Sequence, residues 1–188
     1  MIGKIMWLAV TSRPDMAYAA SYLSRALAAP TYRDFQLADR TLAYAKATAD
    51  ECLVYPNMDW QSAELSVVGD ASFAAPRDNY KSQTGYFIML HDKHRGAMLT
   101  WKSQQQKVKS AGSSMAAECL SAKAAWAHGL YIRDLIGHLV PQTRVLPIRM
   151  VTDNDDLYKM VKERKRSIPK DRSLTIAINQ LRESMDQD

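Results

Sequence analysis

The sequence has few cysteines, glycines and prolines, and it has no long apolar run. Its two cysteines, Cys52 and Cys119, give neither a disulfide framework nor the spacing of a zinc site, which favours a reducing, intracellular compartment such as cytoplasm or nucleus. No apolar run approaches the roughly 20 residues that span a bilayer, so no membrane partner is expected. Glycine and proline occur seven times each, and 47% of the residues are hydrophobic, which excludes a disordered chain. These totals predict a globular protein.

The formal net charge of +5 is concentrated in one segment. Residues 159–172 contain seven Lys or Arg and two acidic residues, while the rest of the chain is balanced. Such a cluster is most often a solvated helix face or a tail, but it also suits a phosphate backbone, because cations release counterions on binding. The candidates for nucleic-acid contact in this segment are Lys162, Arg164, Lys165 and Arg166.

Helical periodicity dominates the first third of the chain. Residues 14–29 repeat apolar side chains every three to four positions, and Pro14 suits a first helical turn. Residues 31–48 repeat the pattern after Pro30. We expect an N-terminal helical pair, followed by a linker at residues 56–62.

The period changes from about residue 63. Short apolar, β-branched runs separated by polar turns predict strands, and alanine- and leucine-rich stretches predict helices. The expected strands are 64–70, 84–90, 97–103 and 147–153, and the expected helices are 113–139, 154–165 and 173–185. Within the longest helix, Gly129 and Gly137 are candidate breaks. The order of elements predicts a mixed α/β domain.

Three acidic residues stand in unusual places within this pattern. Asp70 and Asp153 each end an apolar strand, and Glu118 lies among small apolar residues early in the long helix. If the two strands are neighbours, the three carboxylates meet at one end of the sheet. Such a group suits Mg²⁺ or Mn²⁺, which prefer hard oxygen ligands. The alternative is that they are ordinary turn and helix-cap residues.

Several longer motifs occur in a fixed order along the chain. They are LAVTSRPDMAYAASYLSR (8–25), VVGDASFAA (67–75), DNYKSQTGYFIML (78–90), WKSQQQKVKSAGSSMAAEC (101–119) and TDN (152–154). Together they resemble the ribonuclease H (RNase H) region, with its preceding tether, of Ty1/copia-type retrotransposon polyproteins. The similarity covers nearly the whole chain.

This resemblance implies a fold, a site and a substrate. It implies a tether in residues 1–60 and an RNase H-like domain in residues 61–188, with a mixed sheet flanked by helices. Asp70, Glu118 and Asp153 take the positions of the family's catalytic metal ligands, for Mg²⁺ or Mn²⁺. The implied activity is cleavage of the RNA strand of RNA–DNA hybrids.

The WKSQQQK segment is a further candidate for nucleic-acid contact. Hybrid recognition rests on helix shape, 2′-hydroxyls and phosphates rather than on bases. Trp101, Lys102, Gln104 and Lys107 could form part of such a surface. For Trp101, packing in the protein core is the favoured role.

The chain departs from the family pattern at its C-terminal end. The family continues with a last strand and a last helix that carries a fourth carboxylate, and both are expected to be lacking here. Losing that ligand would impair two-ion cleavage. It would also leave a sheet edge that a partner protein could cover. The alternative to an enzyme is therefore a catalytically inactive RNase H-like module that binds nucleic acid or protein in a larger assembly.

Overall fold

The structure, a computed structural model, describes residues 1–73, 80–107, 113–140, 145–163 and 171–186. Its helices are α1 (Ile2–Thr11), α2 (Ala17–Arg25), α3 (Tyr32–Ala47), α4 (Ser114–Leu139), α5 (Asp155–Lys162) and α6 (Arg172–Asp186). Its strands are β1 (Glu64–Ser72), β2 (Gln83–His91), β3 (Gly96–Gln105) and β4 (Ile148–Val151). The four predicted strands are present within two residues of their expected bounds. None of the helices in these described ranges is long and apolar enough to cross a membrane.

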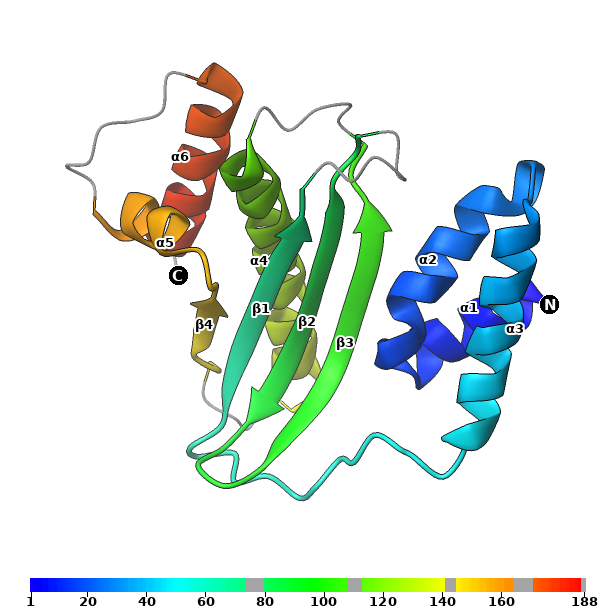
Figure 1. Ribbon diagram of the computed structural model, residues 1–188. Helices are drawn as coiled ribbons and strands as arrows, with labels where there is room; N and C mark the ends of the chain where they lie inside the picture. Colours follow the sequence, from blue (N-terminus) through cyan, green and yellow to red (C-terminus); the bar gives the residue numbers. More distant parts are fainter. Residues whose placement is uncertain (74–79, 108–112, 141–144, 164–170, 187–188) are drawn as a thin grey trace.

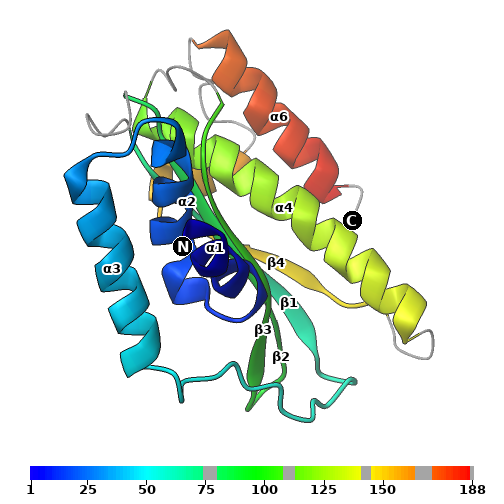
Figure 2. The ribbon, with the colours of Figure 1, turned by 90° about the vertical axis from the view of Figure 1, so that its right-hand side faces the viewer.

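The four strands form one mixed sheet in the order β3-β2-β1-β4 (Figure 1). β2 pairs antiparallel with β1 and β3, whereas β4 runs parallel to β1. α4 makes the crossover between β3 and β4 and packs against β1 and β2, and α6 lies against α4 (Figure 2). The predicted α/β architecture with a mixed sheet and flanking helices is confirmed.

Close packing between α4 and β1 depends on small residues. The apolar side chains of Leu65 and Val67 alternate with more exposed ones along β1, so one face of the strand is buried beneath α4. A Cβ atom at Gly69 would lie 3.4 Å from Ala125 Cβ, and one at Gly129 would lie 2.5 Å from Val67 Cγ2. Glycine at these positions lets the helix and strand backbones approach each other.

Neither of the two candidate breaks interrupts the long helix. α4 continues through Gly129 and Gly137 to Leu139. The packing against β1 supports the helix at Gly129 and outweighs the intrinsic cost of glycine, about 1 kcal/mol per residue. Ser113 caps the N-terminus of α4 by accepting a hydrogen bond from the Ala116 N–H.

The N-terminal segment holds three helices rather than the expected pair. α1 precedes the predicted helices, and its Ile5 and Ala9 are buried in a small core with residues of α2 and α3. The predicted helix 14–29 is divided, because short 3-10 turns at Pro14–Met16 and Ala26–Ala28 flank α2. This helical group lies beside β3 (Figure 1).

Two polar contacts join the helical group to the sheet. The Trp101 indole N–H donates to the Ala9 carbonyl at 2.6 Å, and Gln83 Nε2 donates to Ser21 Oγ at 3.2 Å. The division into residues 1–60 and 61–188 remains a prediction, but these contacts show that the two segments pack on each other.

Candidate metal centre

The site is built at the end of the sheet where β1 and β4 both terminate. Asp70 lies on β1 beyond the buried Gly69, and Asp153 follows the last residue of β4 by two positions. Because β1 and β4 are parallel, their carboxyl ends lie at the same edge. The N-terminal turns of α4, which carry Glu118, cross the sheet at this edge (Figure 1).

These elements bring the three acidic side chains together. One carboxylate oxygen from each of Asp70, Glu118 and Asp153 lies within 4.8 Å of the other two. Asp70 and Asp153 are exposed, whereas only 8% of the Glu118 surface is accessible. The Ala71 N–H donates to Asp70 Oδ1 at 2.7 Å, which orients that carboxylate.

Glu118 is the acid of this cluster whose charged form is disfavoured by its surroundings. Burial raises the pKa of Glu118 to about 7, and the nearby charges of Asp70 and Asp153 add to the shift. Its Oε2 atom is buried and has no hydrogen-bond partner among the described residues. A buried carboxylate oxygen without a donor is costly unless a cation compensates it.

The donor set fits a hard divalent cation. Three carboxylates supply only oxygen atoms, and two of the three side chains reach solvent, so water and a phosphate could complete the shell. Mg²⁺ and Mn²⁺ prefer such ligands, while soft metals require the sulfur or imidazole groups that this cluster lacks. The buried Glu118 Oε2, which has no hydrogen-bond donor among the described residues, is the ligand atom that a bound cation would stabilise most.

Two polar residues that the sequence did not single out fasten α4 to the sheet at this site. The Ser121 hydroxyl is fully buried and contacts two carbonyl oxygens, those of Asp70 at 2.6 Å and Gly85 at 3.1 Å. Gln106 Nε2 donates to the Ala117 carbonyl at 2.9 Å and to Thr84 Oγ1 at 3.0 Å. The sequence signal that could have identified Ser121 is its position as a single serine on the apolar, buried face of α4.

The polar residues that follow Asp153 stabilise the N-terminus of α5. Asn154 caps α5 by accepting a hydrogen bond from the Leu157 N–H at 2.9 Å. Asp155 and Asp156 lie in the first turn of α5, and Asp155 pairs with Lys159. Acids at this position favour the helix dipole.

The residues predicted to contact nucleic acid differ in their exposure. Trp101 is half-buried and directed to α1, so the structure supports its packing role. Lys102, Gln104 and Lys107 are exposed. Lys162 is exposed at the end of α5, with its ammonium group over the Tyr158 ring. The remaining candidates, Arg164, Lys165 and Arg166, lie outside the described residues.

The chain is similar in sequence to several retroelement proteins. It is 32% identical over 56% of its length to the "Retrovirus-related Pol polyprotein from transposon TNT 1-94" of Nicotiana tabacum. It is 36% identical over 57% of its length to the "Putative transposon Ty5-1 protein YCL074W" of Saccharomyces cerevisiae. A third relative, "Secreted RxLR effector protein 161" of Plasmopara viticola, is 29% identical over 60% of this chain.

The similarity identifies the origin but not the activity. The chain is homologous to retrotransposon Pol polyproteins, which supports a retroelement origin of the Ty1/copia type. It spans 8% of the tobacco protein, 33% of the yeast protein and 75% of the Plasmopara viticola protein. No protein-family model matches the chain. No solved structure matches it either.

Proposed function

We propose that this protein is an RNase H-like domain that cleaves the RNA strand of RNA–DNA hybrids with the help of Mg²⁺ or Mn²⁺. The observation that carries the proposal is the convergence of Asp70, Glu118 and Asp153 within 4.8 Å at one end of the mixed sheet. The resemblance of the sequence motifs to the RNase H region supports the choice of substrate. The homology to Pol polyproteins is consistent with it.

The three acids would hold the cation, each from a different element of the fold. Asp70 and Asp153 are held at strand ends and face solvent, where a phosphate can reach them. Glu118 is held by α4, whose position Ser121 and Gln106 fix. When bound, the cation supplies charge compensation at the phosphodiester and lowers the pKa of an attacking water.

The exposed part of the WKSQQQK segment would contact the hybrid beside this site. The strand register pairs Asp70 with Gly85 on β2 and Gly85 with Ser103 on β3. Since neighbouring strands lie about 4.8 Å apart, Ser103 lies roughly 10 Å from Asp70 along the sheet. Lys102 and Gln104 flank Ser103 and are exposed, but their side chains leave β3 on the face opposite that of Ser103, so they would bind phosphates farther along the hybrid rather than at the cleaved bond.

The direct test is cleavage of an end-labelled RNA–DNA hybrid in Mg²⁺ and, separately, in Mn²⁺. We expect the wild type to cut the RNA strand and Asp70→Asn to lose at least about a hundredfold in rate, because a charged ligand is removed. The matched control is Asp155→Asn, which removes a nearby acid that lies outside the cluster. Equal rates for wild type and Asp70→Asn would refute the proposed site.

A non-catalytic binding module is the second candidate. The observation that favours it is that Lys102 and Lys107 are exposed for phosphate contact whether or not the acids act. It predicts that the folded wild type binds the hybrid without cutting it in either metal, and that Asp70→Asn binds equally well. The cleavage assay, run beside a binding assay, separates the two candidates.

A further inference from the structure

The outer edge of β4 presents unpaired backbone groups. The Leu65 N–H donates to the Pro147 carbonyl at 2.8 Å, so the peptide groups of Pro147 and, two residues on, Arg149 face β1. Peptide groups alternate along a strand, and those of Ile148 and Met150 therefore point away from the sheet. Within the described part of the chain, β4 pairs with β1 alone.

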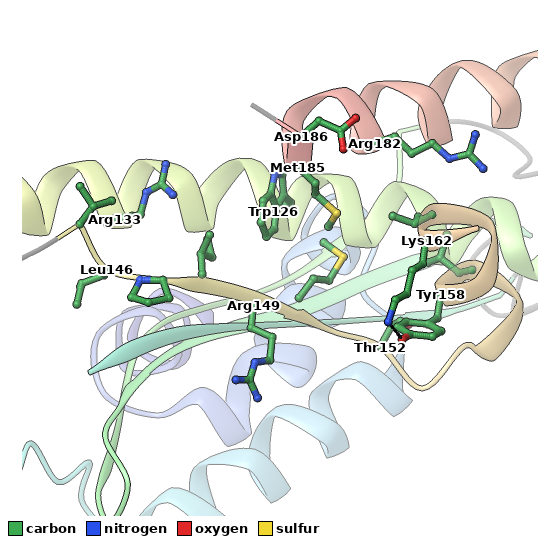
Figure 3. A pocket seen from close by; sticks show the side chains of 16 residues that line it. Trp126, Arg133, Leu146, Arg149, Thr152, Tyr158, Lys162, Arg182, Met185 and Asp186 are labelled. Carbon is green, nitrogen blue, oxygen red and sulfur yellow. Dashed lines mark hydrogen bonds between the residues drawn. The ribbon is translucent and has the colours of Figure 1, made fainter. Parts of the chain in front are cut away.

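A groove of about 820 Å³ lies along this edge (Figure 3). Its floor is apolar and comes from α4, α5, α6 and the inward face of β4. The floor residues are Trp126, Ile148, Met150, Leu157, Val161 and Met185. Trp126 Nε1 is satisfied by Ser184 Oγ at 3.0 Å, so its ring offers only apolar surface to an occupant.

The rim of the groove is cationic. Arg133, Arg149, Lys162 and Arg182 line it, and Asp186 is the one acidic residue in its lining. Arg133 and Lys162 lie toward opposite ends of the groove in Figure 3. Arg149 is exposed on the sheet face opposite the floor, where it pairs with Glu64 at 3.0 Å. Four basic side chains stand against Asp186 in the lining and Glu64 beside it, so the rim keeps a net positive charge, which favours an occupant with negative charge.

We propose that this groove binds an extended segment of a partner protein, which adds as a strand to the outer edge of β4. Side chains of an added strand would point alternately to the apolar floor and to the face that carries Arg149. The segment that fits has apolar residues at every second position and acidic residues between them or at its ends. Backbone hydrogen bonds to Ile148 and Met150 would supply affinity, and the floor and rim would supply specificity.

Other occupants fit the groove less well. A nucleic acid brings phosphates that suit the rim, but it has no peptide groups to match the strand edge and would leave the apolar floor without a partner. A second copy of this chain, paired β4 to β4, would bring two Arg149 side chains and two cationic rims together. Like charges across a strand pair are destabilising.

The experiment selects binders from a displayed library of random dodecapeptides on the whole protein. The discriminating variant is Met150→Pro, which removes an outward-facing N–H and leaves the β1–β4 hydrogen bonds intact, as proline on an edge strand can. Its matched control is Met150→Ala, which removes the side chain but keeps the N–H. We expect enrichment of peptides with alternating apolar and acidic residues, and about tenfold weaker binding to Met150→Pro than to Met150→Ala.

Two further measurements make the outcome decisive. Arg149→Gln, which keeps the strand backbone, should weaken acidic peptides and reduce the salt dependence of their binding even if Met150→Pro does not fold. Asp70→Asn should bind the peptides as the wild type does, so the result is independent of the proposed cleavage activity. The inference is overturned if no peptide is enriched, if Arg149→Gln binds unchanged, if a DNA or RNA oligonucleotide displaces the peptide, or if β4-dependent self-association occupies the groove.

Discussion

At the residue scale, the behaviour of Glu118 follows from its surroundings rather than from its own chemistry. The same side chain in an unfolded chain ionises near 4.5, whereas burial and two neighbouring carboxylates raise its pKa in the fold to about 7. Between about pH 4.5 and pH 7, and without a cation, the folded protein therefore holds a proton on Glu118 that the unfolded chain has released. A bound divalent ion would reverse this preference, because it favours the charged form.

The first prediction concerns stability and pH in the absence of metal. Because the folded pKa of Glu118 is raised, the protonated side chain stabilises the fold relative to the ionised one. This contribution to the free energy of unfolding is complete below pH 4.5 and is lost as the pH rises through about 7. The rise from 4.5 to about 7 corresponds to a loss of about 3 kcal/mol. In EDTA at pH 8, Glu118→Gln should melt roughly 6–12 °C above the wild type, and at pH 4 the two should melt together. Thermal unfolding followed by circular dichroism tests this, and equal melting temperatures at pH 8 would contradict it.

At the element scale, α4 shows how one helix tolerates two glycines for different reasons. Gly129 lies against β1 and β4, where a Cβ atom would come within 2.5 Å of Val67 Cγ2 and 2.8 Å of Ile148 Cδ1. Gly137 is exposed near the end of the helix, with no neighbouring atom within 4 Å of its Cβ position. The first glycine is required by packing, and the second is not.

The second prediction uses these glycines as a matched pair. Gly129→Ala should destabilise the fold by about 1–3 kcal/mol, because the added methyl group forces α4 away from β1. Gly137→Ala should stabilise it by about 0.5–1 kcal/mol, since alanine loses less backbone entropy in a helix. Urea unfolding measures both. If the two variants shifted stability in the same direction, the close approach of α4 to β1 would be wrong.

At the scale of the whole molecule, the N-terminal helices and the sheet meet at Trp101. Its indole N–H bonds to Ala9, and its ring lines a cleft of about 270 Å³ that also contains Met6 and Ala20. Trp101, a candidate nucleic-acid contact for which packing is the favoured role from sequence, thus joins two segments of the fold. Its position leaves Lys102 and Gln104, on either side, to face solvent.

The third prediction tests whether Trp101 holds the helical group in place. Trp101→Ala should increase hydrogen exchange of the amides in α1 and α2, while β1 and β2 keep their protection, because the contact joins two separate cores. Trp7→Ala is the control, since Trp7 is 64% exposed. Unchanged exchange in α1 and α2 would show that other contacts suffice.

The fourth prediction concerns whether Lys102 and Lys107 contact the phosphates of a bound hybrid. Replacing Lys102 and Lys107 with alanine should weaken hybrid binding and reduce the slope of log K against log salt by about 2, one for each lost phosphate contact. Lys93→Ala is the control, because Lys93 is exposed in the β2–β3 turn at the other end of the sheet. A salt titration by fluorescence anisotropy measures the slope, and equal slopes for all three proteins would exclude this surface.

Prediction from sequence worked best where a local pattern has one physical outcome. The alternating apolar residues of β1 and β2 can bury only one face, so their strands were predictable. It failed where distant contacts decide. α1 is not predicted because it is short and its apolar side chains are buried only through contacts with α2 and α3. Gly129 is a candidate break in the sequence because its contacts with Val67 and Ile148 are not visible locally.

By itself, the sequence determined the four strands and most of the helices, and it placed Asp70, Glu118 and Asp153 near the ends of elements that could converge. Only the tertiary structure decided that they do converge, because the parallel pairing of β1 with β4 is a non-local contact. It also decided the raised pKa of Glu118, the contact of Trp101 with α1 and the groove beside β4. Each of these depends on what lies beside a residue in space, and burial, charge and pairing act over distances that sequence separation does not measure.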